Sequence, residues 1–275
     1  MDIYQQVQAF YQQAKTQKTI IGQSVFGRAI YAVRFGHGWP VGIATYAIHG
    51  REFITARLSF EQYLAGVCGS MWFVPIVNPD GALLSQVGLD SAPKSQRKRL
   101  TELNGGKKDF RLWKANGNGV DLNVNFDADW GKGAQNAFTA GAENYVGAYA
   151  FSEPESRALK DFTLQVRPDY TISYHTKGEE IYWYFGQETW RKERDEKLAK
   201  CLSQATMYPL KSVLGSVGGY KDWCISQLQI PAFTVEVGLD EWQHPLTDVV
   251  FGQINEKNKF ALRALSQAVK EMRKE

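Results

Sequence analysis

Residues 41–52 read VGIATYAIHGRE. Positions 41–48 form a short apolar run, which is typical of a strand buried on both faces of a sheet. A helical pattern of apolar residues follows over residues 53–64. A buried strand that leads directly into a helix is the unit of a parallel α/β sheet. The polar residues 49–52 are therefore expected at the carboxyl end of a buried strand, where such sheets form their binding sites.

The rest of the chain repeats this alternation of strands and helices. We expect further strands over residues 29–35, 71–77, 169–174 and 232–237, and helices over residues 3–14, 154–166, 188–207, 222–228 and 248–272. A turn is expected at residues 78–81, which read NPDG. The alternation predicts one α/β domain over residues 1–275, with a mostly parallel sheet covered by helices on both faces.

Composition narrows the range of partners. The 275-residue chain has 44% hydrophobic and 22% charged residues and a net charge of +3. So small a charge does not indicate nucleic acid or a membrane surface as partner, and no apolar stretch is long enough to span a membrane. The first residues, MDIYQQVQAFYQQAK, lack the regions of a secretory signal, so a cytoplasmic location is expected. Three scattered cysteines indicate no disulfide framework.

Three titratable side chains fall at the ends of expected strands. His49 and His175 each follow a strand end, and Glu236 lies near the end of a third strand. These strand ends should meet at one edge of the sheet. Glu52 comes three residues after His49, and with His175 the pair would complete the two-histidine, one-carboxylate set of an open catalytic zinc site. Ordinary helix capping is the alternative explanation of the His-x-x-Glu spacing.

Glu236 stands in the apolar segment FTVEV (233–237). A carboxylate inside an apolar strand is costly unless it is paired or used. Two interpretations stay open, a salt-bridged structural glutamate and a general base with a raised pKa. The remaining histidines, His37 and His244, stand in turn-like sequences and are expected at the surface.

Six segments, taken in order, resemble the zinc metallocarboxypeptidase family. They are HGRE (49–52), PIVNPDG (75–81), GVDLN (119–123), SYH (173–175), GGYKDW (218–223) and TVE (234–236). The resemblance covers residues 20–251 and implies a mixed, mostly parallel sheet of about eight strands between helices. It also implies that His49, Glu52 and His175 bind one zinc ion per chain. Glu236 would be the base in hydrolysis by zinc-activated water.

The resemblance assigns expected roles to four further residues. Lys114 takes the place of an arginine that polarises the scissile carbonyl, where a lysine would supply a point charge. Arg51 and Asn123 match positions that hold substrate. Thr176 follows the distal histidine and is expected to line the cleft.

Two departures concern the binding of a free C-terminal carboxylate. The digestive exopeptidases of the family bind that carboxylate with an Asn-Arg pair. Asn123 is kept here, but Val124 takes the place of the arginine. Those enzymes also bring a phenol to the substrate from the position that Leu214 occupies here. The resemblance therefore does not extend to digestive C-terminal specificity.

Lys221 matches the floor of the family's pocket for the leaving side chain, where a lysine favours a carboxylate. The segments KAN (114–116), VDLN (120–123) and GGYKDW resemble the bacterial γ-D-glutamyl-meso-diaminopimelate peptidases, which cut murein peptides. An anionic murein peptide is therefore the expected partner. Residues 94–114, with eight lysines or arginines against two acidic residues, are either a solvated loop or a basic rim for such a substrate.

Three other functions stay open. N-acyl amino acid deacylases of the succinylglutamate desuccinylase or aspartoacylase kind share the His-x-x-Glu pair and the distal histidine, but they usually lack the full GGYKDW segment. A more general metallocarboxypeptidase would share the whole centre. A binding module that kept the fold without a metal would show neither bound zinc nor turnover that depends on Glu236. The oligomeric state is not indicated.

Overall fold

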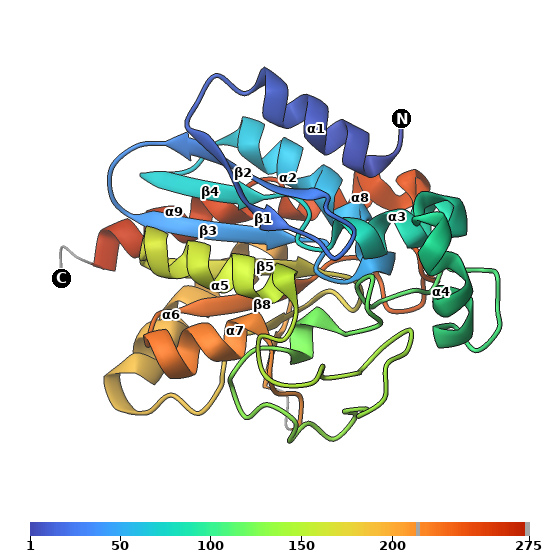
Figure 1. Ribbon diagram of the computed structural model, residues 1–275. Coiled ribbons are helices and arrows are strands. Elements are labelled where there is room, and N and C mark those ends of the chain that lie inside the picture. Colours follow the sequence, from blue (N-terminus) through green and yellow to red (C-terminus); the bar gives the residue numbers. More distant parts are fainter. Residues whose placement is uncertain (213–214, 273–275) are drawn as a thin grey trace.

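An eight-stranded mixed sheet forms the centre of the computed structural model, which describes residues 1–212 and 215–272 (Figure 1). The strands are β1 (Lys18–Gln23), β2 (Ala29–Gly36), β3 (Val41–Tyr46), β4 (Ser70–Val74), β5 (Tyr170–His175), β6 (Glu180–Tyr182), β7 (Leu210–Lys211) and β8 (Ala232–Glu236). They lie in the order β1-β2-β4-β3-β5-β8-β6-β7. The middle strands β4, β3, β5 and β8 are parallel, and antiparallel pairs flank them. The predicted fold class is confirmed.

Helices cover both faces of this sheet (Figure 1). They are α1 (Ile3–Gln13), α2 (Ile54–Ala65), α3 (Pro79–Val87), α4 (Arg97–Leu103), α5 (Pro154–Val166), α6 (Thr189–Thr206), α7 (Tyr220–Trp223), α8 (Asp248–Asn258) and α9 (Ala261–Met272). The helices α2, α6, α8 and α9 share one buried cluster with the sheet, and α5 and α7 share another. In the described part of the chain, no helix has both the length and the apolar character needed to cross a membrane.

Side chains alternate between the two faces along the central strands, and this alternation determines to which face His175 and Glu236 point. Tyr174 of β5 and Val235 of β8 point into the cluster beneath α2, α6, α8 and α9. Their neighbours His175 and Glu236 therefore point to the opposite face. The two strands are in register, with His175 directly beside Glu236. A period of two residues thus brings an imidazole and a carboxylate to the same face at the same edge.

Two of the expected elements are wrong. Residues 79–81 do not form a turn but open α3, because Pro79 fits the first helical position and Asn78 caps the helix. The Asn78 Oδ1 accepts a hydrogen bond from the Gly81 amide at 2.8 Å. The expected long helix over residues 248–272 is two helices, α8 and α9, separated at residues 259–260. The sequence pattern also does not predict β1, β6, β7 or α4.

The first turn of α5 carries a buried carboxyl, Glu155, whose hydrogen-bond partners among the described residues include no cation. Its oxygens accept hydrogen bonds from the Val25 amide and from the Asn116 side-chain amide, both at 3.0 Å. Burial, and then the charge of Asp80, raise the pKa of Glu155 from 4.5 to about 8. The folded protein therefore holds this proton at a pH where the unfolded chain has released it.

This carboxyl should make stability depend on pH. A raised pKa in the folded state contributes stability that is present below about pH 4.5 and is lost as the pH rises through about 8. We expect the free energy of unfolding of the zinc-loaded wild type to fall relative to that of Glu155→Gln between pH 5 and pH 9. Urea titrations at several pH values would measure this difference. A difference that stays constant over this range would contradict the expectation.

Candidate metal centre

The turn after β3 sets the position of His49 and Glu52. Residues Gly50–Glu52 form a single turn of 3-10 helix, with His49 as its extended N-cap residue. Gly50 packs so closely that a Cβ there would lie 2.5 Å from the Gly81 carbonyl, so only glycine fits. The Gly50 amide donates to the Lys114 carbonyl oxygen at 2.9 Å. The NPDG and KAN segments thus hold the turn from outside.

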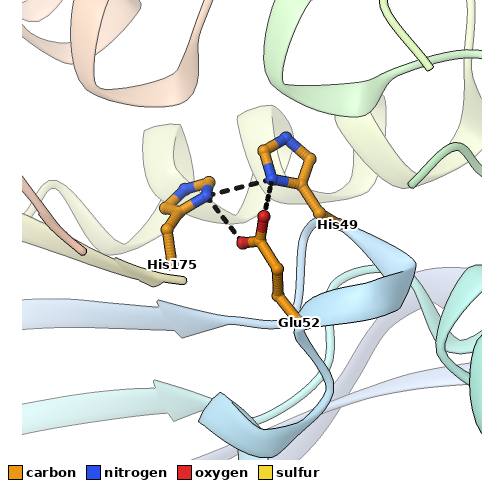
Figure 2. A group of neighbouring side chains, drawn as sticks. All are labelled: His49, Glu52 and His175. Carbon is orange, nitrogen blue, oxygen red and sulfur yellow. Dashed lines mark hydrogen bonds and ion pairs between the residues drawn. The ribbon is translucent and has the colours of Figure 1, made fainter. Parts of the chain in front are cut away.

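Figure 2 shows the imidazoles of His49 and His175 and the carboxylate of Glu52 facing one another. His49 Nδ1 lies 2.8 Å from Glu52 Oε1 and 3.1 Å from His175 Nδ1. His175 Nδ1 lies 3.1 Å from Glu52 Oε2. All three side chains are buried. The structure therefore brings together the three residues predicted as zinc ligands.

This arrangement fits a zinc ion. Zinc bonds to nitrogen and oxygen at about 2.0–2.2 Å in a tetrahedron, which places neighbouring ligand atoms roughly 3.3 Å apart. The three potential ligand atoms lie within 4.8 Å of one another, with contacts of 2.8 to 3.1 Å. Two lone pairs that face each other at such a distance repel unless a proton or a cation lies between them. Two histidines and one glutamate also form the donor set that leaves a position open for catalysis.

Asp121 supports the metal centre from behind His49. Its Oδ1 lies 3.2 Å from His49 Nε2, and its Oδ2 lies 2.7 Å from Lys114 Nζ. A carboxylate at Nε2 holds the proton on that nitrogen and leaves Nδ1 with a lone pair for the metal. Burial acts to raise the pKa of Asp121, but Lys114 and His49 outweigh burial and hold the pKa well below its usual range. Asp121 is therefore ionised in the folded protein.

In the predicted ligands too, the effect of burial on the pKa is opposed by that of neighbouring charges. Burial opposes the charge of Glu52, but His49 and His175 outweigh burial, and the pKa of Glu52 falls well below its usual range. Burial likewise acts to lower the pKa of His49, yet Glu52 and Asp121 raise it. A metal must displace this proton before it can bind Nδ1. The centre is thus built to keep positive charge between its carboxylates.

Glu236 lies beside the metal centre on the neighbouring strand. It lines a cavity of about 200 Å³ together with Asn123, Lys221 and Thr234, which we call the leaving-side cavity. Its Oε2 is buried and has no hydrogen-bond partner among the residues that the structure describes. Burial raises the pKa of Glu236 to about 8, although His175 acts to lower it. The carboxyl is therefore free to exchange a proton with a molecule in this cavity.

The structure places the remaining predicted residues around this centre. Asn123 accepts a hydrogen bond from the Tyr220 amide at 3.2 Å. Lys221, whose side chain is 12% exposed, forms an ion pair with Asp222 and donates to the Tyr184 carbonyl at 3.2 Å. The Lys114 ammonium is bound to Asp121, so it reaches the metal centre through that carboxylate.

Two predicted residues lie on another side of the centre. The Thr176 amide donates to Glu52 Oε2 at 3.2 Å. Arg51 forms an ion pair with Glu143 at 3.0 Å and lines a second cavity of about 640 Å³. Leu214, the position matched with the family's phenol, lies outside the described residues.

Sequence reasoning missed two residues of the site. Asp121 lies in a quoted motif, and its place between Val120 and Leu122 is the same signal that drew attention to Glu236. His244 was expected at the surface, but it is half-buried, and its Nδ1 lies 3.4 Å from Thr176 Oγ1. Burial lowers the pKa of His244 to about 4. Its position depends on the fold of the segment after β8, which local sequence does not reveal.

Comparison with known families and proteins gives matches over most of the chain. A family model described as zinc carboxypeptidase matches residues 69–259, which include His175 and Glu236. The gamma-D-glutamyl-L-diamino acid endopeptidase 1 of Lysinibacillus sphaericus is 32% identical over an alignment of 243 residues that covers 81% of this chain. The chain spans about 60% of the length of that relative.

Solved structures show the same architecture. Bovine thrombin-activatable fibrinolysis inhibitor superposes with a TM-score of 0.79 at 19% identity, over 99% of this chain and 98% of that one. Murein-tripeptide amidase MpaA of Escherichia coli O157 superposes with a TM-score of 0.61 at 23% identity, over 94% and 95% of the two chains. These likenesses show a shared fold.

The contact of Asp121 with His49 should set metal affinity. We expect Asp121→Asn to weaken zinc binding by about 10- to 100-fold, because an amide at this place neither fixes the imidazole as firmly nor supplies charge. Competition with a chromophoric chelator would measure the dissociation constant. Asp195→Asn is the matched control, since Asp195 is equally buried but pairs with Arg194 in α6. Equal zinc affinities for the two variants would contradict this role.

Proposed function

The chain belongs to the zinc carboxypeptidase family, and on that premise we propose that it is a zinc-dependent peptidase of murein peptides. The bond cut would be the amide between the γ-carboxyl of D-glutamate and meso-diaminopimelate. The observation that most directly supports this proposal is the leaving-side cavity, which both Lys221 and Glu236 line, close to the His49–Glu52–His175 centre. The name of the Lysinibacillus relative points to the same class of bond.

His49, Glu52 and His175 would hold the metal through Nδ1, a carboxylate oxygen and Nδ1. When bound, zinc supplies a Lewis acid that polarises a carbonyl and lowers the pKa of water. Asp121 would keep the imidazole of His49 oriented for this task. Glu52 would be held in addition by the Thr176 amide, which donates to its Oε2 at 3.2 Å.

Glu236 would act as the general base. Its Oε2 has no partner in the described part of the chain, so it can take a proton from the attacking water and deliver it to the leaving nitrogen. Burial raises the pKa of Glu236 to about 8, so that without a metal the carboxyl would be mostly protonated near neutral pH. A nearby divalent cation would lower this pKa and favour the ionised base. Lys114, anchored on Asp121, would add positive potential where negative charge develops on the carbonyl oxygen.

The leaving residue would lie in the leaving-side cavity. meso-Diaminopimelate carries a second carboxylate at the end of its side chain. Lys221 presents an ammonium on the cavity wall, and a charge-assisted hydrogen bond to that carboxylate would be shielded from water. Asn123 lines the same cavity and would hold the main chain of that residue. Arg51 and Thr176 would contact the glutamyl side of the bond.

The base and the bond can be tested together. We expect zinc-loaded wild type to release meso-diaminopimelate from L-Ala-γ-D-Glu-meso-diaminopimelate, with products identified by mass. Glu236→Gln should bind zinc normally and lose about 10²- to 10⁴-fold in turnover, because the amide cannot accept the proton. Turnover only on N-acyl amino acids or on ordinary C-terminal peptides would keep the zinc chemistry and overturn the substrate.

The role of Lys221 makes a separate prediction. We expect Lys221→Ala to raise KM for the diaminopimelate peptide by roughly 10- to 100-fold, as a charge-assisted hydrogen bond contributes about 1.5–3 kcal/mol. The KM for the same peptide with lysine in place of diaminopimelate should change little, since lysine has no second carboxylate.

Lys211→Ala is a matched control for that experiment. Lys211 is an exposed lysine on β7 that pairs with Glu180 at 3.4 Å and does not line the leaving-side cavity. Steady-state kinetics on both peptides would separate the variants. Equal increases in KM for the two peptides in Lys221→Ala would refute the pairing of Lys221 with the side-chain carboxylate.

A further inference from the structure

Lysines and arginines gather in one short segment of the chain, after α3. Residues 94–111, which we call the basic strip, hold seven lysines or arginines and two acidic residues, a net charge of +5. The whole chain has a net charge of +3, so the residues outside the basic strip carry a net charge of −2. Positive charge is therefore concentrated in this segment, which the total charge alone does not show.

The basic strip is a folded surface with buried anchors. It consists of a 3-10 turn (Lys94–Gln96), helix α4 and the loop that follows, and Figure 1 shows α4 beside α3. Leu100 of α4 and Phe110 after it are buried in a cluster with Leu84 of α3 and with Trp113. The sequence left open a solvated loop or a basic rim for an anionic substrate. These anchors favour the rim, because they hold the charged side chains on a surface of defined shape.

Four lysines of the basic strip are available to a partner. Their residues are exposed, and their ammonium groups have no ion pair or hydrogen bond among the residues that the structure describes: Lys94, Lys98, Lys107 and Lys108. The three arginines of the strip, by contrast, bind neighbouring groups of the chain. Like charges gathered on one surface repel one another, and an anionic partner would relieve that repulsion.

The basic strip leads to the glutamyl side of the metal centre. Its last residues include Asp109 and Arg111, which line the cavity of about 640 Å³ that Arg51 and Lys177 also line. The Arg111 carbonyl oxygen accepts a hydrogen bond from Ser85 Oγ at 2.7 Å, which fixes this end of the strip to α3. In the proposed function Arg51 contacts the glutamyl side of the bond. The strip therefore continues outward from the side on which the glutamyl part of the substrate would lie.

We propose that the basic strip binds the murein polymer to which the substrate peptide is attached, through carboxylates of neighbouring stem peptides. This inference rests on the proposed function and adds to it a binding surface outside the active site. The glutamyl residue is joined through L-alanine to the glycan strand, so the rest of the polymer leaves the site on the glutamyl side. A γ-linked glutamate keeps its α-carboxylate, and each stem peptide holds more carboxylates than ammonium groups. Weak contacts with several stems add up on one polymer.

Sedimentation with insoluble murein sacculi tests this surface. The parent protein is the zinc-loaded Glu236→Gln variant, which should not digest the sacculi during the assay. The test variant combines four changes in this background: Lys94→Gln, Lys98→Gln, Lys107→Gln and Lys108→Gln. We expect it to bind sacculi about tenfold more weakly or worse, and with less dependence on salt, because four exposed ion pairs are lost together. Unchanged binding would overturn the inference.

A matched control lowers the net charge by the same amount at exposed lysines outside the basic strip. It combines Lys15→Gln, Lys200→Gln, Lys211→Gln and Lys270→Gln in the same parent. We expect its binding to sacculi to stay within about threefold of the parent's. Equal weakening in the two variants would show an effect of net charge alone and would overturn a defined surface. Zinc content and thermal unfolding would check that both variants fold.

Two further arms identify the partner. Sacculi whose carboxylates have been converted into neutral amides by a carbodiimide and ethanolamine keep the polymer, and we expect the parent to bind them about tenfold more weakly or worse. Equal binding to both kinds of sacculi would overturn the role of the carboxylates. Tighter binding of the parent to anionic phospholipid vesicles or to duplex DNA, lost in the four-lysine variant, would overturn murein as the partner.

The proposed function is tested separately by wild type and the soluble peptide L-Ala-γ-D-Glu-meso-diaminopimelate. Failure to release meso-diaminopimelate would refute that function, while sedimentation would still show whether the basic strip binds murein. Release of meso-diaminopimelate, with sedimentation that does not depend on the four lysines, would refute the inference alone.

Discussion

The buried negative charge at the edge of the sheet is the constraint on which the site depends. Glu52 and Asp121 contact His49, and Asp121 also pairs with Lys114, the permanent cation among these residues. Glu236 lies close enough to feel the charges of Glu52, His175 and Lys114. Buried carboxylates without compensating charge are strongly destabilising. In the absence of a metal, the pKa values of His49 and Glu236 are raised, which favours their protonated forms. A divalent cation at the Nδ1 atoms supplies the missing charge directly, so metal binding and the stability of this edge are coupled.

The register of the strands brings the charged side chains of the site together. The parallel strands β3, β5 and β8 end at one edge of the sheet, and His175 and Glu236 occupy paired positions on the same face. The NPDG segment (78–81) then fixes the turn that carries His49 and Glu52 from outside the sheet. Asn78 Nδ2 donates to the carbonyl oxygens of Ile48 and Ala115 at 3.2 and 3.1 Å, and so ties the turn before His49 to the loop after Lys114. A rigid scaffold of this kind keeps the ligands in place before the metal arrives.

Sequence alone predicted the features that have a local signature. Buried strands appear as continuous apolar runs, and His49, Glu52 and His175 stand at their ends. Where one sequence pattern is compatible with two local structures, the prediction was wrong. The dipeptide Pro79-Asp80 with Gly81 suits a turn as well as the first turn of a helix, and only the tertiary bonds of Asn78 select the helix. The ion pair of Lys114 with Asp121 joins two irregular segments, so no periodic pattern reveals it.

Two lysine–aspartate ion pairs place positive charge around the site. Asp121 fixes His49 only while its own charge is compensated, and Lys114 provides this compensation at 2.7 Å. Lys221 is paired with Asp222 in a similar way, and it lines the leaving-side cavity. One ammonium thus compensates the carboxylate that contacts a metal ligand, and the other lies where the proposed function places a carboxylate of the substrate.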